Sequence, residues 1–164
     1  MFTKILVPVD GSAPSDAAVE LALRLGAENR SSVTFVHAVE LSRIAALTGP
    51  SAIDPSLAID AACRAGTAIL AHTQDKAAAA GVACTTQLIE DECVRSVIEA
   101  ARQTKADLIV LGSHGRSGIS RALLGSVAEG ILRRSTVPVL VCHAASAPTP
   151  KLVNADLGRL SLAR

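Results

Sequence analysis

Short apolar runs alternate along the chain with longer amphipathic stretches. The runs are continuous, which is typical of strands buried on both faces, and they predict strands at residues 3–9, 32–39, 82–89, 107–111 and 137–141. Between them, apolar residues spaced i, i+3, i+4, i+7 predict helices around residues 14–25 and 94–101. An alanine-rich composition predicts a helix at residues 57–80, and a further helix is expected at about residues 126–134. Strands that alternate with helices of this length predict a parallel sheet covered on both faces by helices.

The positions of glycine and proline add detail to this pattern of strands and helices. Residues 41–56 contain Gly49-Pro50 and Asp54-Pro55 and predict a loop or a broken helix, long enough to form a flap. Pro138 lacks a backbone N–H, so the last strand is expected at a sheet edge or a partner interface. We expect one domain, followed by an extension after about residue 144.

In an open parallel sheet, ligands bind beyond the carboxyl ends of the strands. The segments to examine are therefore residues 10–12, 39–40, 90–92 and 112 onward. His37, inside an apolar strand, is interpreted as a hydrogen-bonded core residue. The acidic residues 90–92 are interpreted as the negative N-terminus of the next helix.

Composition excludes several functions for the 164-residue chain. With two Phe and no Trp or Tyr, it has no platform for stacking exposed bases, and a net charge of +1 argues against nucleic-acid binding. No apolar stretch approaches the roughly 20 residues that span a membrane, so a cytoplasmic protein is expected. Four separated cysteines without a C-x-x-C pair predict reduced thiols and no zinc site.

A glycine-bearing loop follows the strand at residues 107–111. Its glycines allow the backbone to turn sharply and approach an anion, and a helix that presents free N–H groups opens at Gly125-Ser126. Ser126 and Glu129 also have the spacing of a capping box. Taken singly, each feature has a plain structural explanation. The spacing excludes a P-loop and differs from a dinucleotide-binding motif.

The glycine pattern G-x2-G-x9-G-[ST] is complete as Gly112, Gly115, Gly125 and Ser126. Together with the segments ILVPVDGS, VTFVHAV, ADLIVLGSHGRSG and TVPVLVC, it resembles the ATP-binding universal stress proteins over residues 2–142. The resemblance implies a universal stress protein domain at residues 1–143 and a C-terminal extension at 144–164. It also implies an α/β fold of Rossmann-like, adenine nucleotide alpha hydrolase-like type, with an open five-stranded parallel sheet in the order 3-2-1-4-5.

The resemblance also assigns roles by position. Pro8, Val9 and Asp10 would form the first-strand wall of the ATP site, with Asp10 near the ribose or Mg. The backbone of Ala38 would read the adenine edge, and Leu111 would line the same pocket. Ribose and phosphates would be wrapped by Gly112, Ser113, His114, Gly115, Arg116, Ser117 and Gly118. The β- and γ-phosphates would meet Gly125, Ser126 and Val127.

The leading hypothesis is an ATP-binding, homodimeric stress-response protein, with AMP or ADP as other possible resident nucleotides. The homodimer would pair through the last strand, Val137, Pro138, Val139, Leu140 and Val141. One alternative is a slow ATP hydrolase or nucleotidyl-transfer enzyme, with Asp10 holding magnesium and His114 as acid or base. Another is a nucleotide-free dimerisation or adaptor module. Without aromatic rings, adenine would be held by aliphatic side chains and backbone, so the phosphate loop would carry much of the affinity.

Overall fold

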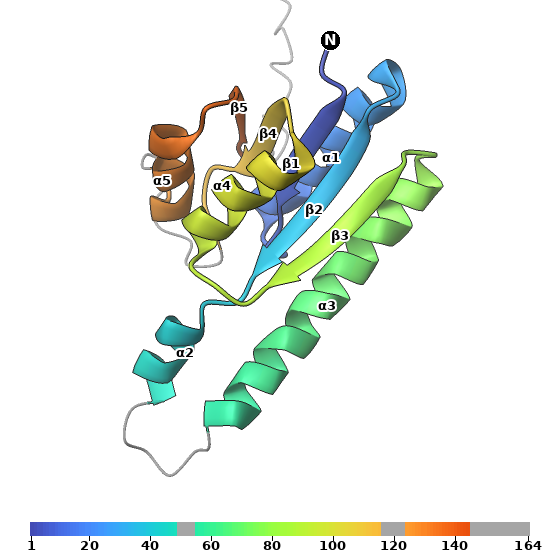
Figure 1. Ribbon diagram of the computed structural model, residues 1–164. Helices are drawn as coiled ribbons and strands as arrows, with labels where there is room; N and C mark the ends of the chain where they lie inside the picture. Colours follow the sequence, from blue (N-terminus) through green and yellow to red (C-terminus); the bar gives the residue numbers. More distant parts are fainter. Residues whose placement is uncertain (49–54, 116–123, 145–164) are drawn as a thin grey trace, which may run out of the picture.

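Five parallel strands build one sheet in the computed structural model, which describes residues 1–48, 55–115 and 124–144 (Figure 1). The order is β3-β2-β1-β4-β5, as expected, and every pairing is parallel. The strands are β1 (Lys4–Pro8), β2 (Ser32–Ala38), β3 (Cys84–Ile89), β4 (Leu108–Gly112) and β5 (Val139–Cys142). The helices are α1 (Ala13–Asn29), α2 (Leu41–Thr48), α3 (Pro55–Ala79), α4 (Cys93–Thr104) and α5 (Ser126–Arg134).

Two apolar clusters, one on each face of the sheet, form the core. Ile5 and Val7 of β1 pack with α1 and α3, whereas the intervening Leu6 packs with α4 and α5. All three side chains are buried, because neighbouring residues of a strand point to opposite faces and both faces are covered. This two-sided burial explains the continuous apolar runs of the sequence.

The segment predicted as a loop or a broken helix contains α2, and α3 begins at Pro55, two residues before the expected start. Residues 49–54 lie outside the described part of the chain. At about 1.5 Å per residue, the 25 residues of α3 extend well beyond the six-residue strand β3. Figure 1 shows α2 and the first turns of α3 projecting past the carboxyl ends of the strands.

The last strand lies at one edge of the sheet, as Pro138 predicted. Pro138 itself precedes β5, and its carbonyl oxygen accepts a hydrogen bond of 3.0 Å from the Ile109 N–H. The opposite edge is β3, which begins at Cys84, two residues later than expected. Within the described ranges, no helix is both long and apolar enough to cross a membrane.

Candidate functional site

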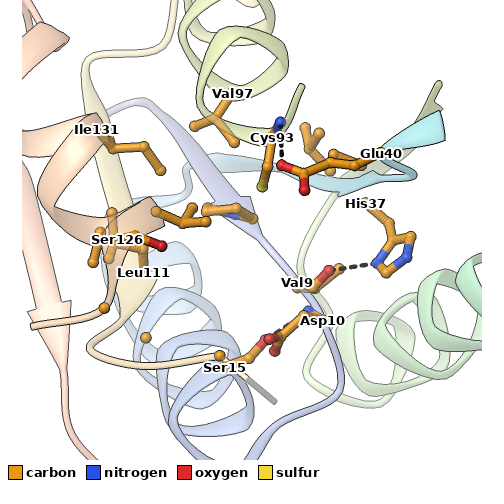
Figure 2. A pocket seen from close by; sticks show the side chains of 18 of the residues that line it. Val9, Asp10, Ser15, His37, Glu40, Cys93, Val97, Leu111, Ser126 and Ile131 are labelled. Atoms are coloured by element: carbon orange, nitrogen blue, oxygen red, sulfur yellow. Dashed lines mark hydrogen bonds between the residues drawn. The ribbon is translucent and has the colours of Figure 1, made fainter. Parts of the chain in front are cut away.

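A cavity of about 440 Å³ opens where β1, β2 and β4 end, within the size range of small-molecule sites (Figure 2). Its walls also come from α2, α3, α4 and α5. Twelve of the residues predicted for the site line it: Pro8, Val9, Asp10, Ala38, Leu111, Gly112, Ser113, His114, Gly115, Gly125, Ser126 and Val127. The remaining three, Arg116, Ser117 and Gly118, lie outside the described residues.

The described glycines of the loop lie close to neighbouring atoms. A Cβ on Gly112 would lie 2.7 Å from the backbone of Pro14 and Ser15, and one on Gly125 would lie 3.2 Å from the carbonyl oxygen of Ser113. A Cβ on Gly115 would lie 2.8 Å from Asp10 Oδ2. None of these three glycines has a positive φ, in contrast to Gly11 and Gly81. The sharp turn expected of them is therefore not what requires glycine here.

Among the described residues, no side chain caps the N-terminus of α5. The N-cap is Gly125, which has no side chain to make a capping hydrogen bond, and Ser126 is the first helical residue. The predicted capping box with Glu129 is wrong, and Glu129 instead forms an ion pair with Arg133 at 2.8 Å. The first turn of a helix has N–H groups without intrahelical acceptors. Because Ser126 and Val127 line the cavity, this positive helix end is available to an anion there.

His114 contributes an unpaired polar atom to the wall. Its Nδ1 lies 2.9 Å from the Ser113 hydroxyl, while its buried Nε2 has no hydrogen-bond partner in the described part of the structure. Most buried polar atoms in folded proteins are hydrogen-bonded. His114, which lines the cavity, therefore carries one buried ring nitrogen without a hydrogen-bond partner among the described residues.

Asp10 lies across from the glycine loop. Its Oδ1 accepts hydrogen bonds from the Ser12 N–H at 3.0 Å and the Ser12 hydroxyl at 2.6 Å. Ser12 in turn caps α1 by accepting a hydrogen bond from the Ser15 N–H. The carboxylate is thus fixed at the start of α1, with Oδ2 on the side of Gly115.

Asp10 also decides how well the site suits magnesium. Among the described residues, no group of three or more His, Cys, Asp or Glu side chains could hold a metal ion. Mg²⁺ is commonly bound through one or two carboxylates together with substrate phosphates and waters. One carboxylate beside a positive helix end fits a magnesium ion that arrives with a phosphate ligand, and does not form a metal site of its own.

His37 joins the ends of β1 and β2. It is 7% exposed, and its Nδ1 lies 2.6 Å from the carbonyl oxygen of Val9, which confirms the expected hydrogen-bonded core histidine. The Val9 N–H donates to the carbonyl oxygen of Val36 at 2.8 Å. His37 also lines the cavity, so its core role fixes the wall next to Ala38.

Sequence reasoning missed the wall made by Glu40 and Cys93. Glu40 Oε1 accepts a hydrogen bond of 3.1 Å from the Cys93 N–H at the start of α4. Burial, followed by the charges of Glu40, Glu92 and Asp10, raises the pKa of the Cys93 thiol to about 12. The thiol therefore stays protonated at neutral pH. The position of Glu40 after β2 was a usable signal, but its contact with a residue 53 positions later was not visible in the sequence.

The structure is that of an α/β protein with a cavity at the carboxyl ends of its parallel strands. The family model for the universal stress protein family matches residues 1–143. The chain therefore belongs to the universal stress protein family, as its resemblance indicated.

Individual relatives agree with this assignment. The chain is 33% identical over 141 residues to universal stress protein MJ0531 of Methanocaldococcus jannaschii, covering 86% of this chain and 82% of that protein. It is also 33% identical to universal stress protein YxiE of Bacillus subtilis, covering 86% and 99%. A universal stress protein solved in complex with cAMP is 29% identical and superposes with a TM-score of 0.62, covering 88% of this chain and 98% of that one.

Proposed function

We propose that this protein binds ATP, with AMP and ADP as related ligands, and acts as a nucleotide-dependent regulator of stress responses in the cytoplasm. The observation that carries the proposal is the uncapped N-terminus of α5 in the wall of a cavity that also contains the glycine loop. A relative that was solved with cAMP supports a nucleotide with an adenine base.

The cavity suits the parts of ATP in a definite orientation. Figure 2 shows Ser126 and Leu111 on one side and Val9, His37 and Glu40 on another. Phosphates would lie at the start of α5 and along Gly112–Gly115. There, backbone N–H groups and His114 Nε2 would form hydrogen bonds with them. The base would lie against aliphatic side chains and the backbone of Ala38. Asp10, between these regions, would take the ribose hydroxyls or a magnesium ion brought by the phosphates.

Equilibrium binding of a fluorescent ATP analogue with magnesium tests this proposal. The wild type is expected to bind saturably, and the double variant Gly115→Val, Ser126→Leu to lose at least a hundred-fold in affinity. In that variant, the valine introduced beside Asp10 crowds its carboxylate, and the introduced leucine covers the helix end. The matched control is Ala79→Val with Arg134→Leu, two exposed positions outside the cavity. Absence of saturable binding, or equal binding by the double variant, would refute the proposal.

We also propose that two copies pair through the β5 edge. Leu140 of this edge strand is 40% exposed, and Pro138, which cannot donate a hydrogen bond, precedes it. Sedimentation equilibrium is expected to give twice the monomer mass for the wild type and the monomer mass for Leu140→Lys. A monomeric wild type at micromolar concentration would contradict the pairing.

A further inference from the structure

Glu40 places a second carboxylate in the cavity, apart from Asp10. It lines the cavity two residues after the end of β2, and its side chain is 25% exposed. Figure 2 shows the carboxylate beside Cys93, across the cavity from Ser126. It therefore lies on the side assigned to the base, away from the helix end assigned to the phosphates.

The surroundings of Glu40 hold the carboxylate in place. Oε1 accepts the hydrogen bond from the Cys93 N–H, and Oε2 lies 3.8 Å from the guanidinium of Arg43. Cys93 is the first residue of α4, and the N-terminus of a helix favours negative charge. An ionised carboxylate has about four acceptor positions and no donor. These two contacts leave acceptor positions for a group inside the cavity.

The backbone next to Glu40 determines which N–H and C=O groups would face a bound base. The Val39 N–H donates to Ile89 of β3 at 2.8 Å. Backbone groups of successive strand residues point to opposite sides, so the N–H and C=O of Ala38 point toward β1, which ends at Pro8. Ala38 thus offers one donor and one acceptor to a ligand beyond the end of β1, and Glu40 adds acceptors alone.

We propose that Glu40 is a specificity-determining residue that selects purine nucleotides with an amino group at C6 over those with a 6-oxo group. The inference rests on the proposed nucleotide function of the same cavity. A 6-amino group has two N–H bonds, one for the carbonyl of Ala38 and one for the Glu40 carboxylate. A 6-oxo group would face both acceptors without a proton, and unpaired polar groups in a binding site strongly disfavour a ligand.

Competition binding with ATP and inosine triphosphate, which carries the 6-oxo group, measures this selection. Glu40→Gln keeps an oxygen for the Cys93 N–H and turns an NH₂ toward the base, so it is expected to fold as the wild type does. The expected result is an ATP preference of more than ten-fold in the wild type that falls about ten-fold in Glu40→Gln, with inosine triphosphate gaining affinity. Glu20→Gln, on the exposed side of α1, is expected to keep the wild-type preference.

Other results of this competition experiment would overturn either the inference or the proposed function. An ATP preference that is equal in the wild type and Glu40→Gln, or parallel losses for both nucleotides, would show that Glu40 has a structural role and would overturn the inference. So would tighter binding of GTP than of ATP, because the carboxylate would then read the N1–H and 2-amino group of guanine. If no nucleotide binds the wild type saturably, the proposed function itself fails.

Discussion

The helices α4 and α5 lie side by side on one face of the sheet, and they differ in how the N–H groups of their first turns are hydrogen-bonded. At the start of α4, Glu92 accepts hydrogen bonds from the Val94 and Arg95 N–H groups, and Glu40 accepts one from the Cys93 N–H. At the start of α5, Gly125 supplies no side chain. The protein thus satisfies the start of α4 with its own carboxylates, whereas no side chain of the described residues caps the start of α5.

The largest expected effect comes from giving α5 a carboxylate of its own. Ser126→Glu would place a negative charge in the first turn, which stabilises a helix by about 0.5 kcal/mol. The same charge would repel phosphates, so ATP affinity is expected to fall more than a hundred-fold, or about 2.7 kcal/mol. Calorimetric binding and thermal unfolding measure the two effects.

The control for this variant is Thr136→Glu, which adds the same charge at an exposed position beyond α5. It should leave ATP binding within two-fold of the wild type. If Ser126→Glu binds ATP as the wild type does, the helix end is not the phosphate site.

A smaller effect is expected where the two helices touch. A Cβ on Gly130 of α5 would lie 2.7 Å from Val94 Cγ2 of α4, so Gly130→Val should cost about 1–3 kcal/mol of unfolding free energy by overpacking. Adding Val94→Ala should restore part of this loss, because it removes the crowding methyl groups. Urea denaturation of the wild type, the two single variants and the double variant measures the coupling, and strictly additive losses would argue against this contact.

Removal of the cap of α4 should lower stability without affecting the ligand. Glu92→Ala leaves two N–H groups without their carboxylate and is expected to cost about 1 kcal/mol. ATP affinity should stay within two-fold, since Glu92 is not part of the cavity wall. A large loss of binding with little loss of stability would reverse the assignment of the two helix ends.

The smallest expected effect is a change in the pKa of Asp91. The hydrogen bond from Arg95, followed by that from the Glu92 N–H, holds the pKa of Asp91 below its ordinary value. A lowered pKa means that the ionised form stabilises the folded state above the unfolded-state pKa, and that this contribution is lost as the pH falls through the lowered value. NMR titration should show Asp91 returning toward its ordinary pKa in Arg95→Gln. An unchanged titration would exclude Arg95 as the main cause.

The sheet and one helix end could be predicted because they depend on local signals. Continuous apolar runs indicated strands buried on both faces, Pro138 indicated the edge strand, and the Gly125-Ser126 pair indicated the start of α5. The predicted capping box failed because the helix begins one residue earlier than such a box requires. With Ser126 as the first helical residue, Gly125 takes the N-cap position, and Glu129 pairs along the helix with Arg133.

The wall of the cavity at Glu40 could not be predicted from the sequence in the same way. Glu40 follows a strand, which made it a residue to examine, but its orientation depends on the Cys93 N–H from a helix far along the chain. The glycines were predicted to turn the backbone toward an anion, whereas in the structure Gly112 and Gly115 lie against α1 and Asp10 through tertiary contacts. Contacts of this kind have no local sequence signal.

We expect the open end of α5 and the glycine loop to carry much of the affinity for ATP, because aliphatic side chains and backbone would hold the base without aromatic stacking. Calorimetric titration of the wild-type protein with ATP and with adenosine separates the two contributions. We predict that ATP binds at least ten-fold more tightly than adenosine. Equal affinities would contradict the account, since the phosphates would then contribute nothing at the start of α5.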